Sequence, residues 1–502
     1  MTPVTTSANG MVDSHLPAVL QVTPRDGVAV ALRDLDAGES CAGVIARSPV
    51  PRGHKIALRQ HGVGEPVTKY GFCIGRATTI IAPGDHVHSH NLATALAGEL
   101  VYAYHQSTPR PTVFASARRF QGFVRSDGRV GTRNEIWVLP TVGCVARTAQ
   151  KIAAAAVAAG SISGVHAFGH PHGCSQLGDD LSGTRAILAA LADHPNAGGV
   201  LIVGLGCESN QIDALLAQIP AARRERIRTL RAQGDGDEIA KGVTLVAELV
   251  ALAGADVAES VPLDRLVVGL KCGGSDAFSG LTANPLVGCI ADAVTDAGGS
   301  AILTEIPEVF GAETQLLARA ADHAVFDATV ALVNDFKRYF LDHGEPVSEN
   351  PSPGNIDGGI TTLEEKSLGA VQKGGHATVV DVIDYGETLR RRGLTLLSAP
   401  GNDAVSSTAL AAAGATVILF TTGRGTPLGF PVPTLKIASN SALAAAKPGW
   451  IDFDAGRVLG EGLDDAAEAL LTTVVAIASG QPTAAERNDE REIAIWKRGV
   501  TL

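Results

Sequence analysis

The 502-residue sequence contains no apolar run that approaches the roughly 20 residues of a membrane-spanning helix. Its seven cysteines are odd in number and include no CxxC pair, which argues against a disulfide framework and against a zinc ribbon. It also lacks a Lys/Arg-rich run, and a formal charge of −11 offers nucleic acid no basic surface. We therefore expect reduced thiols, no membrane or nucleic-acid partner, and a small polar substrate.

Several motifs that mark common enzyme classes are also missing. There is no GxxxxGK[ST] phosphate loop, no GxGxxG turn, no GxSxG elbow and no HExxH helix. These absences argue against nucleotide-driven, hydride-transfer, esterase and zincin chemistry. Residues 1–15 have neither the basic start nor the apolar centre of a signal peptide, so we expect a cytoplasmic protein.

The length predicts several domains, because single cores rarely grow past about 250–300 residues. Short strand-like runs between turns fill the first hundred residues, whereas apolar strands alternate with Ala-rich helical stretches after them. This alternation is typical of βαβ units and predicts parallel sheets, with helices over 148–159, 181–192 and 239–253. The predicted parts are a disordered leader (1–21), a small β domain (22–103), a linker (104–119), a second α/β domain (120–258) and a large C-terminal α/β domain (259–502).

Thiol and polar residues recur where the predicted strands end. An open parallel sheet binds its ligand outside the carboxyl ends of its strands, so these residues predict a polar active site at such an edge. The clearest case is VVGLKCGGSD, in which an apolar strand ends in Cys272, two glycines, Ser275 and Asp276. The other residues at predicted strand ends are Cys144, Cys174, Cys207, Glu208, Glu305, Glu308, Asn402 and Asp403.

The HVHSH segment is a candidate metal site. On a strand, His86, His88 and His90 share a face, and neutral imidazoles suit Fe, Mn or Zn. The alternatives are direct catalysis and a solvated strand end. Four cysteines, Cys144, Cys174, Cys207 and Cys272, are candidates to hold iron or an iron–sulfur cluster. Cysteine beside glycine is more often simply packed, and no spacing motif supports a cluster.

Charged residues at turns offer further candidates. Arg133, with Asn134 beside it, is suited to anchor a carboxylate through its guanidinium fork, whereas Arg125 and Arg129 are better explained by surface ion pairs. Lys366 is a candidate base if it is desolvated, although an exposed helix lysine is the more frequent case. Helix capping is the alternative role for the carboxylates of Asp276 and Asp403.

Together these segments resemble the altronate and galactarate dehydratase family. The shared motifs, in order, are DGRVGTRN, PTVGC, GCSQLGDD, GLGCE, CGGSD-SG-TANP, TEIPE-FGAE, NPSPGN-GGITTLE-KS, SAPGNDAV, TGRGTP and WIDFDAG, and they cover nearly the whole chain. GCSQLGDD and RNEIWVLPTVGC look more like the altronate branch. The resemblance implies an N-terminal β-clip domain of the antifreeze-like type followed by two α/β domains. It also implies dehydration of D-altronate to 2-keto-3-deoxy-D-gluconate in hexuronate catabolism, assisted by Fe(II) or Mn(II).

The reaction suggests a role for each candidate. We predict that His86 and His88 bind the metal, that Lys366 or His170 is the base, and that the other of these two, or Glu305, is the acid. The predicted substrate contacts are Arg133, Asn134, His172, Ser275, Asp276, Asn350, Asn355, Asn402 and Arg424. His172 stands where the family usually has tyrosine, which puts its contact in question, and Lys271 falls outside the family pattern.

Other functions remain open at this point. The substrate is alternatively galactarate, another polyhydroxy acid or a small sulfonated acid, and the enzyme is alternatively an iron–sulfur hydro-lyase that uses the cysteines. A sugar-acid-binding protein with no turnover is the alternative from a different class. A chain of this size and type often forms a homodimer.

Overall fold

The computed structural model describes residues 17–96, 98–104, 117–158, 164–234 and 236–502. The N-terminal domain contains only short strands, arranged as the sheet β1-β2-β5-β8, the sheet β6-β7-β9 and the pair β3-β4. This confirms the predicted small β domain. Its strands are β1 (Val19–Leu20), β2 (Val28–Ala31), β3 (Ser40–Cys41), β4 (Val44–Ile45), β5 (Lys55–Ala57), β6 (Pro66–Lys69), β7 (Phe72–Ala77), β8 (His86–Val87) and β9 (Leu92–Ala93).

Two predicted boundaries differ from the structure. Residues 1–16 lie outside the described residues, but β1 falls within the predicted leader and pairs with β2, so the leader was predicted too long. Most of the predicted linker, residues 105–116, also lies outside the described residues. Tyr102, just before it, packs against the C-terminal domain, where its hydroxyl bonds to Glu313. The first strand of the next domain begins at Arg119, the last residue of the predicted linker.

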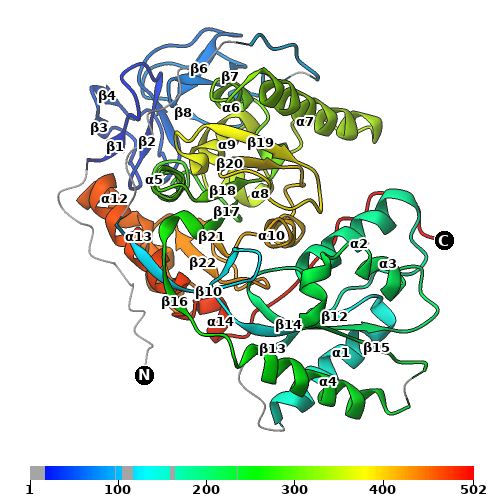
Figure 1. Ribbon diagram of the computed structural model, residues 1–502. Helices are drawn as coiled ribbons and strands as arrows, with labels where there is room; N and C mark the ends of the chain where they lie inside the picture. The colour runs from blue at the N-terminus through cyan, green and yellow to red at the C-terminus, as the bar shows by residue number, and fades with distance from the viewer. Residues whose placement is uncertain (1–16, 97, 105–116, 159–163, 235) are drawn as a thin grey trace, which may run out of the picture.

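The second domain is built on a four-stranded parallel sheet in the order β13-β12-β14-β15. Helices α1 and α4 cover one face, and α2 and α3 the other (Figure 1). A small antiparallel sheet, β11-β10-β16, joins this domain to the next. Its elements are β10 (Arg119–Val124), β11 (Val130–Gly131), β12 (Glu135–Pro140), α1 (Ala146–Ala158), β13 (Val165–Ala167), α2 (Gly178–Ala192), β14 (Ala197–Gly204), α3 (Ile212–Leu216), β15 (Ile227–Arg231), α4 (Glu238–Ala253) and β16 (Glu259–Pro262).

The C-terminal domain contains a seven-stranded parallel sheet in the order β19-β20-β18-β17-β21-β22-β23. Its strands are β17 (Val267–Cys272), β18 (Ser300–Leu303), β19 (Val379–Ile383), β20 (Gly393–Leu397), β21 (Val417–Thr422), β22 (Thr434–Ala438) and β23 (Phe453–Asp454). The chain adds strands on one side of β17 first and on the other side later. The strand order therefore reverses at β17, which is where such sheets bind ligands.

Helices cover both faces of this sheet. α5 and α13 pack on one face, and α10 packs on the other, where it also contacts α2 of the second domain. The helices are α5 (Ala283–Asp296), α6 (Glu313–Leu317), α7 (His323–Asp342), α8 (Pro353–Asp357), α9 (Leu363–Ala370), α10 (Asp403–Ala412), α11 (Ser441–Ala446), α12 (Val458–Glu461), α13 (Leu463–Ala478) and α14 (Ala484–Arg487). The predicted parallel sheets and the three predicted helices are thus confirmed.

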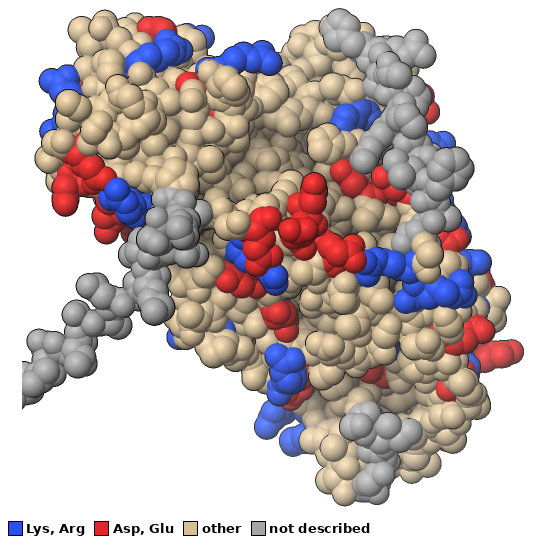
Figure 2. Space-filling view, turned by 90° about the vertical axis from the view of Figure 1, so that its left-hand side faces the viewer, with Lys and Arg blue, Asp and Glu red and all other residues tan. Residues whose placement is uncertain are grey.

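Shared cores hold the three domains together. Val67 and Ile74 of the β domain belong to the same buried cluster as Leu363 and Leu368 of α9. A second cluster joins the other two domains, since Trp137 of β12 lies in it with residues of α10. Acidic side chains gather in the middle of one face of the molecule, over α12 and α13 (Figure 2). Among the described residues, no helix is both long and apolar enough to cross a membrane.

Candidate active site

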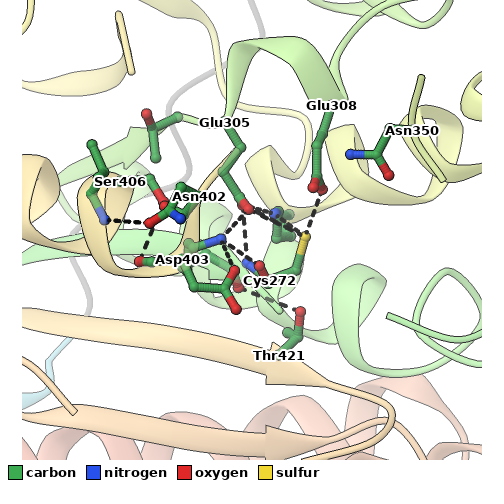
Figure 3. A network of polar contacts seen from close by, with 12 residues as sticks. Cys272, Glu305, Glu308, Asn350, Asn402, Asp403, Ser406 and Thr421 are labelled. Carbon is green, nitrogen blue, oxygen red and sulfur yellow. Dashed lines mark hydrogen bonds and ion pairs between the residues drawn. The ribbon is translucent and has the colours of Figure 1, made fainter. Parts of the chain in front are cut away.

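The carboxyl edge of the seven-stranded sheet holds a dense cluster of paired charges (Figure 3). Lys271, the last but one residue of β17, is fully buried. Its ammonium group donates to Asp403 Oδ1 at 2.8 Å and also to Glu305. The pKa of Lys271 is raised, because these two carboxylates outweigh the effect of burial, which alone would lower it. Lys271 is therefore a permanent cation in the floor of the site.

Glu305 is the anion at the centre of this cluster. It follows β18 in a left-handed backbone conformation, with φ 65°, which is uncommon outside glycine. Its carboxylate accepts from Lys373 Nζ at 2.7 Å and from the Cys272 backbone N–H at 3.0 Å, in addition to Lys271. Burial would raise the pKa of Glu305, but the two ammonium groups lower it. The side chain is held in its ionised form by these ammonium groups, which does not suit the predicted role of Glu305 as the acid.

The Cys272 thiol lies between the same groups. Lys373 Nζ is 2.8 Å from its sulfur, and the sulfur is 3.4 Å from Glu308 Oε2 and 3.5 Å from Glu305 Oε2. Burial, reinforced by Glu305, raises the pKa of Cys272 to about 12, so the thiol keeps its proton. Within the described parts of the chain, Cys272, Glu305 and Glu308 form the one group of three whose ligand atoms lie within 4.8 Å of one another. Lysine ammonium groups already neutralise it, which leaves little need for a metal ion.

Lys366 projects from α9 toward the same edge. Its ammonium group donates to Glu308 Oε1 and to Asn350 Oδ1, both at 2.9 Å, and to Asn355 Oδ1 at 3.3 Å. Burial alone would lower the pKa of Lys366, but the Glu308 carboxylate more than offsets that effect and raises it. Lys366 is thus charged and is suited to give a proton rather than to take one.

A cluster of four histidines lies where the β domain meets α8. His54 Nδ1 is 3.0 Å from His86 Nε2, and the His54 and His88 rings stack with centroids 4.7 Å apart. The His90 ring lies 5.4 Å from that of His86. Burial, together with the neighbouring histidines, lowers the pKa of His86 to about 3. The imidazole of His86 is therefore neutral at physiological pH, as a metal ligand must be.

The short helix α8 connects the histidine cluster with Lys366. On one side, His88 Nε2 lies 3.1 Å from the Ile356 carbonyl oxygen, and His54 Nε2 lies 3.4 Å from that of Asp357. On the other side, Asn355 bonds to Lys366. The predicted metal-binding histidines and the predicted catalytic lysine therefore flank one helical turn.

Buried ion pairs dock the β domain beside this turn. Lys55 Nζ and Lys69 Nζ bond to the two carboxylate oxygens of Glu365, at 2.9 and 2.8 Å. All three side chains are at most 1% exposed. Because Glu365 precedes Lys366 in α9, the same pairing fixes the position of the catalytic candidate.

Three predicted substrate contacts instead support α8 and its neighbours. The Ser275 carbonyl accepts from Asn355 Nδ2 at 2.8 Å, and Arg424 Nη1 donates to the Gly354 carbonyl at 3.0 Å. Asp276 is buried and accepts from the Ser279 backbone N–H at 2.9 Å. Asp276 also accepts from the Ser439 hydroxyl at 2.8 Å. Asp276 is therefore a structural residue and not a direct substrate contact.

Asn402 caps a helix. Its Oδ1 accepts from the Val405 backbone N–H at 3.1 Å, at the start of α10. The sequence assigned possible capping to Asp403, which pairs with Lys271 instead. The Asn402 side chain oxygen is thus engaged by the protein itself rather than free to bind a sugar hydroxyl.

Arg133 and Asn134 lie at the wrong end of their sheet for the predicted role. They precede β12, at the amino edge of the second-domain sheet. The Arg133 guanidinium pairs with Glu486 at 2.7 Å, and Asn134 Nδ2 donates to the Ala253 carbonyl at 2.8 Å. The prediction that they bind the substrate carboxylate is therefore wrong.

His170 and His172 lie at the carboxyl edge of the second-domain sheet. His170 Nε2 is 2.8 Å from the Pro140 carbonyl, and its Nδ1 accepts from the His172 backbone N–H at 3.2 Å. Both ring nitrogens are engaged, and burial lowers the pKa of His170 to about 4. This geometry contradicts the predicted acid–base role for His170. Cys144, Cys174 and Cys207 lie at the same edge and are exposed, whereas Cys272 is buried in the other cluster.

Lys271, Lys373 and His54 are the site residues that the sequence analysis missed. Lys271 interrupts an apolar strand, VVGLKC, and a charge in a buried parallel strand must find a partner. Lys271 was left out of the predicted site because it falls outside the family pattern. His54 and Lys373 carry no comparable signal, because their neighbours in space come from distant segments.

Comparison with known proteins identifies the family of the chain. Three family models match in order: the altronate/galactarate dehydratase SAF domain over residues 17–95, the D-galactarate dehydratase/altronate hydrolase second domain over 122–254, and the D-galactarate/altronate dehydratase C-terminal domain over 263–501. The chain belongs to the altronate/galactarate dehydratase family. Within this family it is 46% identical to the altronate dehydratase of Bacillus subtilis, over 97% of this chain and 100% of that protein.

Two Escherichia coli relatives show where the chain stands in this family. The chain is 48% identical to the altronate dehydratase, over 96% of this chain and 99% of that protein. It is 30% identical to the galactarate dehydratase (L-threo-forming), over 92% of this chain and 93% of that protein. The resemblance found in the sequence is therefore confirmed, and the altronate dehydratases are the more similar branch.

Proposed function

We propose that the protein is a hydro-lyase that dehydrates D-altronate to 2-keto-3-deoxy-D-gluconate. The observation that carries this proposal is near-complete coverage at 46% and 48% identity by two altronate dehydratases, against 30% for a galactarate dehydratase. The three lysine ammonium groups at the carboxyl edge of the seven-stranded sheet support it, because the reaction builds negative charge on a sugar acid.

The chemical difficulty lies in the C2 proton. Its transfer to a base creates a second negative charge beside the substrate carboxylate, which preorganised cations stabilise in a buried site. The Glu308 carboxylate, which lies 2.9 Å from Lys366 Nζ, would accept this proton. Of the three lysines at this edge, Lys366 is 8% exposed, whereas Lys271 and Lys373 are 0% and 1% exposed. Lys366 is therefore the lysine placed to meet the substrate and to protonate the leaving C3 hydroxyl. Lys271 and Lys373 hold the Glu305 anion and keep the floor of the site rigid.

A divalent ion, Fe(II) or Mn(II), would be held by His86 and His88, and oxygen atoms of water or of the substrate would complete its ligand set. His86 and His88 present imidazoles whose pKa values burial lowers, so they are neutral donors. The cysteine–carboxylate group, in contrast, already holds three ammonium groups. A bound ion would supply positive charge for the substrate carboxylate. The protein's own part is to hold the imidazoles neutral and against α8.

Turnover tests this function directly. We would strip the purified protein with a chelator and measure formation of the 2-keto-3-deoxy acid without oxygen, with and without Fe(II) or Mn(II). D-altronate should give metal-dependent product, and galactarate much less. Binding of D-altronate with no turnover under any metal would contradict the enzyme and favour a sugar-acid-binding protein.

A further inference from the structure

Three Gly-Cys dipeptides end three adjacent strands of the second-domain sheet. Cys144 follows β12, Cys174 follows β13 and Cys207 follows β14. These strands are neighbours in the order β13-β12-β14 and run parallel, so the three cysteines come to one edge. That edge is where open α/β sheets bind ligands.

The loops that carry these cysteines form one packed unit. The Gly143 N–H donates to the His172 carbonyl at 2.8 Å, and the Asn210 N–H donates to the Gly173 carbonyl at 2.9 Å. Asn210 Nδ2 also bonds to the Thr141 carbonyl at 3.1 Å. Gly173 has φ 101°, and a Cβ there would lie 2.1 Å from the Thr141 oxygen. Only glycine, which has no Cβ, allows this approach. Gly173 therefore lets the loops that carry Cys144 and Cys174 pack against each other.

Packing does not explain these three thiols. Cysteine is among the most buried residue types, yet Cys144, Cys174 and Cys207 are all exposed and free. Ser175, directly after Cys174, has φ 57° and is one of five described non-glycine residues with positive φ. Such strain collects at functional sites.

The spacing of the sulfurs excludes a single ion in this arrangement. Two thiolates bound to one zinc ion at about 2.3 Å lie at most about 4.6 Å apart. Among the described residues, the one triad of ligand atoms within 4.8 Å of one another is the cysteine–carboxylate group around Cys272. At least one pair among the sulfurs of Cys144, Cys174 and Cys207 is therefore farther apart than one ion spans. An iron–sulfur cluster contains several iron ions, so it can join thiolates that lie farther apart than a single ion allows.

We infer that Cys144, Cys174 and Cys207 hold an iron–sulfur cluster through three thiolates. Iron–sulfur clusters are generally bound by four cysteines. Cys272 is not available as the fourth, because it is buried at the edge of the other sheet and contacts Lys373. The cluster therefore keeps one coordination position open to a small oxygen ligand, such as a hydroxyl or carboxylate. The inference does not depend on which sugar acid is the substrate.

Metal and sulfide content test the inference without reference to activity. We would express the full chain with ample iron, purify it without oxygen, and measure iron, acid-labile sulfide and the visible absorption of a sulfide–iron chromophore. The parent protein should contain both iron and labile sulfide. Cys144→Ser, Cys174→Ser and Cys207→Ser should each lose most of both. Cys73→Ser is the matched control, since Cys73 is an exposed free thiol in the β domain, and it should keep the parent content.

Thiol mapping keeps the test decisive if a serine variant fails to fold. In the anaerobic parent protein, an alkylating reagent followed by peptide mass spectrometry should label Cys73 and spare Cys144, Cys174 and Cys207. After a chelator removes the iron, the reagent should label Cys144, Cys174 and Cys207 as well as Cys73. Parent protein without labile sulfide, or equal labelling of the four thiols before chelation, would overturn the inference.

Discussion

The carboxyl edges of the two parallel sheets carry different kinds of side chains. At the seven-stranded sheet, Lys271 and Lys373 surround Glu305, and these three charges are buried and paired. At the four-stranded sheet, the exposed thiols of Cys144 and Cys174 stand on tightly packed loops. Buried charges depend on their partners, whereas exposed thiols contribute little to folding. The first edge should therefore tolerate substitution poorly and the second should tolerate it well.

The largest expected effect is on turnover at the charged edge. Lys366→Met should lower kcat by roughly 10²–10⁴-fold with a smaller change in KM, because a general acid acts in the transition state. Steady-state kinetics with D-altronate measure both constants. Lys151→Met, which changes an exposed lysine on α1, is the control and should leave both constants near the parent values. Near-parental kcat in Lys366→Met would remove this lysine from the mechanism.

Stability should distinguish a buried ion pair from a surface pair. Glu305→Gln leaves Lys271 and Lys373 without their shared anion and should lower the free energy of unfolding by about 3–5 kcal/mol. Glu461→Gln removes an exposed partner of Arg457 on α12 and should cost at most about 1 kcal/mol. Urea unfolding measures the two values. Equal losses would mean that the charged edge is not held by its pairing.

The sequence predicted the strands and helices that form both edges better than it predicted the chemistry of their side chains. The alternation of apolar strands and helices predicted the parallel sheets, and strand ends predicted where Cys272, Glu305 and the three Gly-Cys dipeptides would lie. What it did not supply was the partner of each group. Lys373 reaches Cys272 across 101 positions, and Glu486 reaches Arg133 across 353. Contacts of this range depend on how domains pack, and no local pattern reports them.

The roles predicted for single residues were wrong for the same reason. Arg133 has the guanidinium that a carboxylate needs, but it precedes its strand and so lies at the opposite edge from the strand ends. His170 follows its strand, yet the backbone takes both of its ring nitrogens. The residue type was suitable in both cases, but only His170 lies at the predicted edge of its sheet. The direction of the side chain and its hydrogen-bond partners decided the role.

Acid should affect the second domain before it affects the charged edge. Burial lowers the pKa of His170 to about 4 and that of His194 to about 3, below the usual value of 6.5. The unfolded chain thus binds more protons than the folded one between these values. Stability is fully present above pH 6.5 and falls as the pH drops, by about 1.4 kcal/mol per pH unit for each such group.

Urea unfolding between pH 7.5 and 5 measures this slope. His170→Gln and His194→Gln should each reduce it, whereas His323→Gln, which changes an exposed residue of α7, should not. The carboxylates of Glu305 and Glu365 have lowered pKa values, so their contribution is lost only below about pH 4.5. An unchanged slope in both buried-histidine variants would show that other groups carry the acid response.

The smallest expected effect separates capping from substrate binding at Asn402. Asn402→Ala removes the oxygen that accepts from Val405 at the start of α10, and should cost about 1 kcal/mol of stability. Asn402→Ser restores a capping oxygen and should recover most of that loss, although serine cannot replace an amide that binds a sugar hydroxyl. Thermal unfolding and KM for D-altronate separate the two roles. If Asn402→Ser recovers stability and both variants keep a parental KM, the residue serves only to start the helix that presents Asp403 to Lys271. A KM raised equally in both variants would return Asn402 to the substrate site.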